Sequence, residues 1–298
     1  MRGATTVYYA GAAGADTFPG FKKYVIDVSA TRIKAFLHIA RQGQLNADIG
    51  ELTDLRYADV DRAVEICDQY KQDIVGVKIR MTRGLVGENG REGLKRARAV
   101  CEATGLPLML HPNESPLSPA EMLGQMQAGD ILTHCFHRSE TGVLDKDGRV
   151  RPEARKAVEQ GVLFDVGHGA GSFSFEVAEE AMRQGLRPGT ISSDLHHYNL
   201  YGPVYDLATT LSKFMVLGWS LEEVVAQATV APARAMGVLG EIGTLAVGAC
   251  ADVAIFDLQS GVFDFEDSAR WLALSSGLIY MQETLIDVAL FSISEIDG

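Results

Sequence analysis

Four polar residues stand within or at the ends of otherwise apolar segments, and their types suit metal chemistry. Lys78 lies in IVGVKIRM, His111 in LPLMLHP, His134 in GDILTHCFH and Asp194 in GTISSDLHH. Imidazole nitrogens and carboxylate oxygens are ligands of zinc and similar divalent ions. Such an ion lowers the pKa of a bound water to about 7, so that a hydroxide nucleophile exists at neutral pH. If these four side chains converge, they predict a hydrolytic metal site.

The lysine of this set requires an explanation of its own. A charged lysine in a buried strand is costly unless it is paired, so we expect Lys78 to be neutral, paired or chemically modified. Carbamylation by CO2 would convert its amine into an anionic ligand that can bridge two metals. The alternative is an ordinary ion pair, just as a single histidine at a strand end is more often structural than a ligand.

The elements that must position these residues are predicted from the alternation of short β-branched runs with longer amphipathic stretches, which is typical of βαβ units. Seven strands are expected, at Thr5–Ala10, Ile33–Ile39, Ile74–Met81, Pro107–His111, Asp130–His134, Val162–Val166 and Thr190–Asp194. The four polar residues are 33, 23 and 60 positions apart (111−78, 134−111, 194−134), so each belongs to a different strand. They can meet at the C-terminal mouth of a parallel α/β barrel, where such enzymes keep their sites.

Helix starts and a change of period divide the rest of the chain. SPAE at 118–121 and SLEE at 220–223 are capping-box patterns. Helical sequence is expected from about residue 205 to 236, after which GTLAVGACADVAIFDL indicates short glycine-punctuated β segments. We therefore expect a barrel over residues 1–236, a partial β-sandwich segment over 237–267 and a divergent tail over 268–298, the tail being an added helix or poorly ordered.

Composition limits the class of partner. The 298 residues are 47% hydrophobic and carry a formal net charge of −12, so a large core is available but no basic stripe for nucleic acid. A small polar or neutral molecule suits this balance better. The sequence has no stretch of about 18 uncharged apolar residues, and its four cysteines form no CxxC pair, so we expect a cytoplasmic protein without a membrane anchor.

At these residues the chain resembles the dihydroorotase-like deacetylase branch of the amidohydrolase superfamily, over roughly residues 1–257. The resemblance implies a TIM-like (β/α)8 barrel whose strand-4 lysine is carboxylated, whose strands 5 and 6 end in histidines and whose strand 8 ends in an aspartate. Lys78, His111, His134 and Asp194 match those positions in order. GTLAVGACADVAIFDL resembles the small β-sandwich that follows the barrel in the superfamily.

The resemblance also assigns roles. Carboxylated Lys78 would bridge two ions, His111 and His134 would hold the second, and Asp194 would bind the first. Asp194 would take a proton from the attacking water and return it to the departing amine. The ion would be Zn2+, with Mn2+ as an alternative.

One part of the family pattern has no counterpart in this sequence. The His-x-His pair of strand 1, which completes the first metal site, is absent, and GATTVYYAGAAG resembles the second-strand motif. The expected fold is therefore a barrel that lacks its first strand. Its two open sheet edges would cost stability or invite pairing with another chain, including a second copy in a homo-oligomer.

Two further residues could bind substrate. Arg80 has the same strand parity as Lys78, so its planar guanidinium could hold a substrate carboxylate, although a salt bridge to a neighbouring loop is the alternative. His168 lies in DVGHGAGSF, where glycines allow close approach to a ligand and the ring could orient a substrate carbonyl. His38 is expected to be structural.

The sequence predicts a metal-dependent hydrolase of an amide or ester, most plausibly of an N-acyl or N-acetyl group on a small polar molecule. Two alternatives stay open at this point. The chain could be a truncated or degenerate, non-catalytic barrel used for binding or assembly, or it could be a deaminase of the same superfamily, which shares the metal and the fold.

Overall fold

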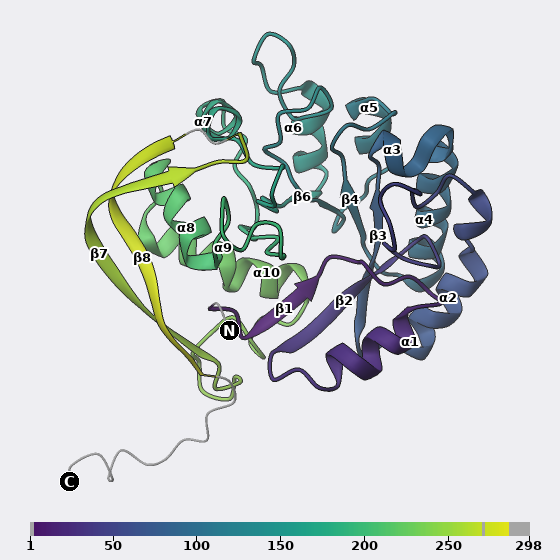
Figure 1. The fold of residues 1–298 in the computed structure, drawn as a ribbon, viewed down its shortest axis with the longest axis horizontal. Coiled ribbons are helices and arrows are strands. Elements are labelled where there is room, and N and C mark those ends of the chain that lie inside the picture. The colour runs from purple at the N-terminus through teal and green to yellow at the C-terminus, as the bar shows by residue number, and fades with distance from the viewer. Residues whose placement is uncertain (1–2, 270–271, 286–298) are drawn as a thin grey trace.

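A sheet of six parallel strands carries the predicted site. Its order follows the chain, with β1 (Thr6–Tyr9), β2 (Arg32–His38), β3 (Ile74–Arg80), β4 (Leu108–His111), β5 (Ile131–Leu132) and β6 (Leu163–Phe164). Every neighbouring pair is parallel. The computed structural model describes residues 3–269 and 272–285, and Figure 1 shows the sheet curving through the centre of the molecule. Six of the seven predicted strands, and the partial TIM-like barrel, are confirmed.

The seventh predicted strand, Thr190–Asp194, runs beside β6 without forming a regular ladder. A single bridge joins Asp165 to Thr190, and His168 N–H donates to the Ser192 carbonyl at 3.1 Å. The hydroxyls of Thr190 and Ser192 instead donate to the carboxylate of Asp165, at 2.7 and 2.8 Å. Side-chain bonds therefore hold this segment where the sequence pattern predicts backbone pairing.

Helices follow the outer side of the sheet, as the amphipathic stretches predict (Figure 1). They are α1 (Phe18–Phe21), the π-helical turn η1 (Lys22–Ile26), the 3-10 turns η2 (Leu55–Tyr57) and η3 (Gly87–Asn89), α2 (Val60–Gln69), α3 (Arg83–Val86), α4 (Gly90–Thr104), α5 (Pro119–Leu123), α6 (Pro152–Glu159) and α7 (Phe175–Arg183). The longer helices α2, α4, α6 and α7 bury apolar residues in one continuous core that includes Leu37, Val77 and Leu110 of the strands. The capping box predicted at Ser118 and Glu121 is formed at the start of α5.

The helical sequence predicted for residues 205–236 forms three helices, α8 (Leu207–Val216), α9 (Leu221–Ala228) and α10 (Val230–Ala235). The second predicted capping box, Ser220 with Glu223, begins α9. Asp206 caps α8 by accepting the Thr209 N–H at 2.7 Å. Helix α8 has one charged residue, Lys213, which is fully buried.

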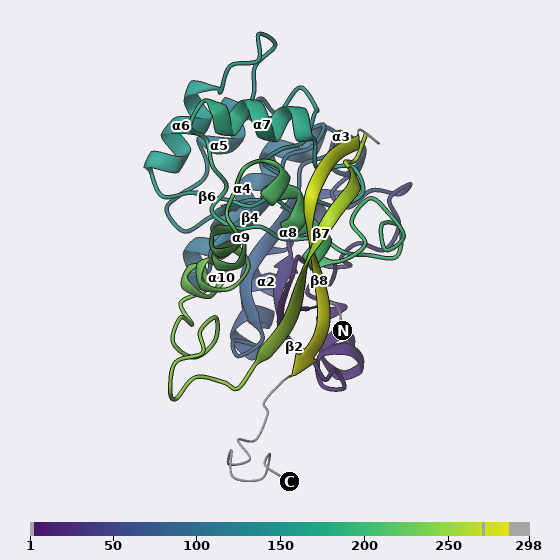
Figure 2. The ribbon, with the colours of Figure 1, turned by 90° about the vertical axis from the view of Figure 1, so that its left-hand side faces the viewer.

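Two long antiparallel strands, β7 (Val253–Glu266) and β8 (Leu272–Leu285), form a separate hairpin. Figures 1 and 2 show it as a curved ribbon that runs along α8. The structure thus gives Leu272–Leu285 as a strand, where the sequence pattern led us to expect an added helix or a poorly ordered tail. An apolar run of this kind fits a buried helix or a strand equally well, and the partner strand decides between them.

The closed end of the hairpin is attached to the barrel by hydrogen bonds. The Asp267 carboxylate accepts the Phe175 N–H at 3.1 Å, and Ser268 bonds the Phe173 backbone in both directions, at 3.0 and 3.1 Å. Phe265 is buried in the same core as the strands. The hairpin therefore rests against the loop that follows β6.

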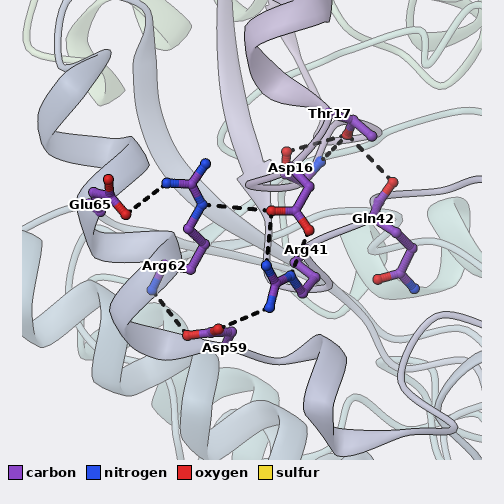
Figure 3. A network of polar contacts seen from close by, with 8 residues as sticks. Asp16, Thr17, Arg41, Gln42, Asp59, Arg62 and Glu65 are labelled. Atoms are coloured by element: carbon purple, nitrogen blue, oxygen red, sulfur yellow. Dashed lines mark hydrogen bonds and ion pairs between the residues drawn. The ribbon is translucent and has the colours of Figure 1, made fainter.

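A network of ion pairs joins the segments around β2 (Figure 3). Arg41, in the loop after β2, binds Asp16 before α1 at 2.6 Å and Asp59 at the start of α2 at 3.2 Å. Arg62 reaches Asp16 and Glu65. These groups are substantially exposed, so we assign them an orienting role that adds little stability. No helix in the described residues is both long and apolar enough to cross a membrane.

Candidate functional site

Three of the four predicted ligands lie at one end of the parallel sheet. Lys78 is near the end of β3, His111 is the last residue of β4, and His134 follows β5 by two residues. The rings of His111 and His134 meet edge to face, with their centroids 4.4 Å apart. The parallel register accounts for this meeting, since Arg80 is opposite His111 across β3 and β4 and Leu110 is opposite Leu132 across β4 and β5.

Asp194 reaches the same end from the segment beside β6. Its neighbour Ser193 accepts the Gly169 N–H at 3.1 Å, and a Cβ built on Gly169 would lie 2.9 Å from Asp194 Oδ2. Asp194 itself is exposed, whereas Lys78 and His134 are buried. The carboxylate thus stands at the open side of the cluster.

The pKa values of these groups reflect burial and one another's charge. Burial lowers the pKa of Lys78 to about 8, against the opposing effect of the Asp194 carboxylate. Burial also lowers the pKa of His134, and lowers the pKa of His111 well below its ordinary value, with His134 and Lys78 adding to the effect on His111. Both imidazoles are therefore neutral at pH 7, which is the state in which histidine binds a metal.

One hydrogen bond fixes which nitrogen of His134 faces the cluster. Its Nδ1 lies 2.5 Å from the carbonyl oxygen of Gly167, and since a carbonyl can only accept, Nδ1 carries the proton. Nε2 then keeps its lone pair for a ligand, as metal-binding histidines require. Gly167 makes this approach possible because it has φ +46°, and an added Cβ would lie 2.3 Å from Thr133 Oγ1.

The other three side chains leave their polar ends unused by the protein. Within the part of the chain that the structure describes, the Lys78 amine, the His111 ring and the Asp194 carboxylate make no hydrogen bond. Two of the four predicted ligands also adopt a costly backbone, since φ is 62° at His134 and 45° at Asp194. Strain of this kind, about 1–3 kcal/mol for each residue, is concentrated at functional sites.

The donor chemistry fits a divalent cation once Lys78 is counted. Among the described residues, no cluster of three or more histidine, cysteine, aspartate or glutamate side chains is arranged to hold a metal. His111 and His134 supply two nitrogens, and a carboxylated Lys78 would supply an oxygen beside them. The unmodified lysine would not serve, because a protonated amine has no lone pair.

Arg80 has its guanidinium engaged by a residue that sequence reasoning missed. Its Nε donates to Glu51 Oε1 at 2.8 Å, and Nη2 bonds the same oxygen. Glu51 also lies 3.0 Å from Nε2 of His38, although these two atoms do not align as a hydrogen bond. Burial alone would raise the pKa of Glu51, yet His38 and Arg80 hold it below its ordinary value. A salt bridge therefore exists, and a substrate-binding role for Arg80 stays a prediction.

His168 also has its polar atoms occupied. Its Nδ1 bonds the Gly169 carbonyl at 2.9 Å, its Nε2 lies 2.8 Å from the Lys213 amine, and its ring stacks on Phe173. Burial, with Lys213 adding to it, lowers the pKa of His168 to about 3. The predicted role in orienting a substrate stays a prediction, and the observed contacts all lie within the protein.

Sequence reasoning missed two more buried polar residues near the site. The Asp165 carboxylate accepts hydroxyl hydrogen bonds from Thr133, Thr190 and Ser192 at 2.7–2.8 Å. Lys213 links α8 to His168. A lone charged residue inside an apolar strand or helix is the signal that could have found both, and it is the signal that singled out Lys78.

Comparison with known proteins finds relatives that are named deacetylases. A deacetylase from Brucella anthropi and one from Agrobacterium fabrum are each 37% identical to this chain over 268 residues, which is 90% of the chain. The chain spans 66% of the length of these relatives. A deacetylase from Enterococcus faecalis is 37% identical over 270 residues, 90% of this chain and 72% of its own length.

Two solved structures resemble the fold over nearly the whole chain. One is described as an adenine deaminase, with a TM-score of 0.91 and 35% identity over 96% of this chain and 77% of its own. The other is described as a dihydroorotase, with a TM-score of 0.88 and 34% identity over 96% and 75%. The sequence model of the amidohydrolase family matches residues 3–282. The chain belongs to the amidohydrolase family.

Proposed function

We propose that this chain is a metal-dependent amidohydrolase that removes an acyl group, most plausibly acetyl, from the nitrogen of a small polar molecule. The observation that carries the proposal is the meeting of Lys78, His111 and His134 at the C-terminal end of the sheet, with their metal-binding ends unused. The deacetylase names of the relatives supply the reaction class.

The proposed roles follow from the contacts of each side chain. Nε2 of His134 and the ring of His111 would hold one ion, together with a carboxylate formed when CO2 adds to the neutral Lys78 amine. A divalent cation in this position lowers the pKa of water and polarises the scissile carbonyl. Exposed Asp194 would accept a proton from the attacking water and give it to the leaving amine.

We further propose that a single ion occupies the site. His111, His134 and Lys78 provide three ligands at one position, which is the number that catalytic zinc sites use. A second ion would have only Lys78 and Asp194 among the predicted ligands. Zn2+ suits the nitrogen donors, and Mn2+ is the alternative.

The test combines metal analysis with an assay for amide hydrolysis. Protein reconstituted with Zn2+ and bicarbonate is expected to retain about one ion and to release acetate from members of an N-acetyl amino acid panel. Lys78→Ala should lose both properties, whereas Lys34→Ala, which removes a lysine of β2 that bonds the Gln72 carbonyl, should keep them. If reconstituted wild-type protein retains no metal and hydrolyses no substrate of the panel, the non-catalytic alternative is favoured.

A deaminase is the second candidate, because the solved structure with a TM-score of 0.91 is described as an adenine deaminase. The two reactions differ in the group that leaves. Ammonia released from an amino-substituted heterocycle, without acetate released from any N-acetyl compound, would decide for the deaminase.

We also propose a reducing, cytoplasmic location. All four cysteines are free thiols, and Cys67, Cys101 and Cys135 are buried. Burial raises the pKa of the Cys67 and Cys101 thiols to about 12, which keeps them unreactive. Survival of full activity after prolonged treatment with a reducing agent would support this location, and loss of activity would argue against it.

A further inference from the structure

The buried lysine of α8 connects two loops beside the candidate site. Lys213 Nζ donates to the Pro203 carbonyl at 2.7 Å and lies 2.8 Å from His168 Nε2. Pro203 belongs to the loop after Asp194, and His168 belongs to the loop after β6. Lys213 is the single charged residue of α8, and it is fully buried, where a charged lysine is costly unless it is paired.

The direction of the bond between Lys213 and His168 can be deduced. His168 Nδ1 is 2.9 Å from the Gly169 carbonyl, which can only accept, so Nδ1 carries the proton of the neutral ring. Nε2 is then an acceptor, and Lys213 must donate to it. The low pKa of His168, which results from burial and the Lys213 charge, keeps the ring neutral at pH 7.

Each loop held by Lys213 positions one predicted ligand. In the first loop, the Gly167 carbonyl accepts a hydrogen bond from His134 Nδ1, and the backbone N–H of His168 donates to the Ser192 carbonyl. In the second loop, buried Asn199 donates to the Asp194 carbonyl at 2.9 Å and accepts the His196 N–H through its side chain. The Asn199 carbonyl in turn accepts the N–H groups of Gly202 and Tyr205 on either side of Pro203.

We propose that Lys213 is a positioning residue, which holds the loops around Gly167 and Asn199 so that His134 and Asp194 keep the orientation needed to bind a metal. The metal in this inference rests on the proposed function. The first consequence of the inference, that His134 and His168 carry their protons on Nδ1, can be tested without a metal. Carboxylates of Glu266, Asp267 and Asp206 partly offset the burial of the lysine, whose pKa is lowered to about 7.

The first experiment reads the histidine tautomers directly. In two-bond 1H–15N spectra of protein labelled at its histidines, His168 and His134 should both carry the proton on Nδ1. In Lys213→Met, which removes the donor but keeps an unbranched chain, His168 should become a mixture of tautomers and the His134 signals should shift or broaden. A wild-type His168 protonated on Nε2 would overturn the proposal even if the variant does not fold.

The second experiment measures Zn2+ affinity by competition with a chelator. Substitution of a residue that orients a metal ligand typically lowers the metal affinity about 10–100-fold, so Lys213→Met should bind Zn2+ about 10–100-fold more weakly. Lys213→Arg, which can still donate, should recover a large part of this loss.

Thr210→Val is the matched control, because Thr210 is fully buried on the same helix and its hydroxyl donates to the Asp206 carbonyl at 2.9 Å. It should lower the unfolding midpoint without changing the His134 signals or the Zn2+ affinity. Wild-type affinity and unchanged His134 signals in Lys213→Met would overturn the proposal. If wild-type protein binds no Zn2+ while the tautomers change as expected, the proposed function fails and the coupling between Lys213 and His134 stands.

Discussion

At the scale of single residues, the candidate site includes polar groups whose burial costs free energy that a bound ligand would offset. Stability is lower without a ligand, because the imidazole of His111, Nε2 of His134 and the amine of Lys78 then lack a partner. Sequence reasoning could find these residues because a charged or ionisable group in an apolar strand is conspicuous. It could not find Glu51 as the partner of Arg80, because that contact joins a loop to a strand 29 positions away.

Modification of Lys78 is the first prediction at this scale. Protein incubated with 13C-bicarbonate and Zn2+ should show a carbamate carbon signal. CO2 adds to the neutral form of the buried amine, which loses a proton, and the metal then holds the carbamate that is formed. The signal should be absent from Lys78→Ala and present in Lys34→Ala. Equal signals in both variants would place the carbamate elsewhere, and no signal in wild-type protein would leave Lys78 an ordinary lysine.

The pH dependence of stability is the second. Burial lowers the pKa of His137 and of His168 to about 3, so between about pH 6.5 and 3 the unfolded chain binds protons that the folded chain does not. The free energy of unfolding should therefore fall as the pH falls, by about 2 kcal/mol for each histidine between pH 7 and 5. Urea unfolding at the two pH values measures this, and His137→Gln should reduce the slope by one histidine's share. An unchanged slope in that variant would contradict the assignment.

At the scale of elements, the sequence predicted those helix starts and strands that depend on residues close together in the chain. Both capping boxes and six of the seven strands follow from residues adjacent in the chain. The exception is Thr190–Asp194, where the hydroxyls of Thr190 and Ser192 bond Asp165. That interaction depends on a residue 25 and 27 positions away, so the alternation of apolar residues could not reveal it.

Asp165 should accordingly be the polar residue on which the strand ends depend most. Asp165→Ala would leave the buried hydroxyls of Thr133 and Thr190 and the half-buried hydroxyl of Ser192 without their acceptor, and it should lower the free energy of unfolding by about 3 kcal/mol or more. Ser192→Ala, which removes one of the three bonds, should cost about 1 kcal/mol. Urea unfolding of the two variants is the measurement, and equal losses would show that Asp165 does not hold the segments together.

At the scale of the whole molecule, the hairpin of β7 and β8 completes the core beside α8. The apolar sequence of residues 272–285 is compatible with a helix, a tail or a strand, and only its pairing with β7, between positions 6 to 32 residues apart, selects the strand. The hairpin meets the loop after β6 through Asp267 and Ser268, so it supports the same loop that carries Gly167 and His168.

Substitution of Phe265 tests whether the hairpin folds as one unit with the barrel. Phe265 is buried in the main core, whereas Val262 on the same strand is exposed. Phe265→Ala should lower the free energy of unfolding by about 3 kcal/mol because it leaves a cavity, and Val262→Ala should change it by less than about 0.5 kcal/mol. Similar small effects in both variants would mean that the hairpin folds independently of the barrel.

The central claim is that Lys78, His111 and His134, with Asp194 at the open side, hold a divalent ion at the end of the sheet. Anomalous diffraction at the zinc edge, from crystals grown with Zn2+ and bicarbonate, tests it most directly. We expect one strong peak between the rings of His111 and His134 and beside the end of Lys78. No peak there at saturating Zn2+, or a zinc ion held by other residues alone, would contradict it.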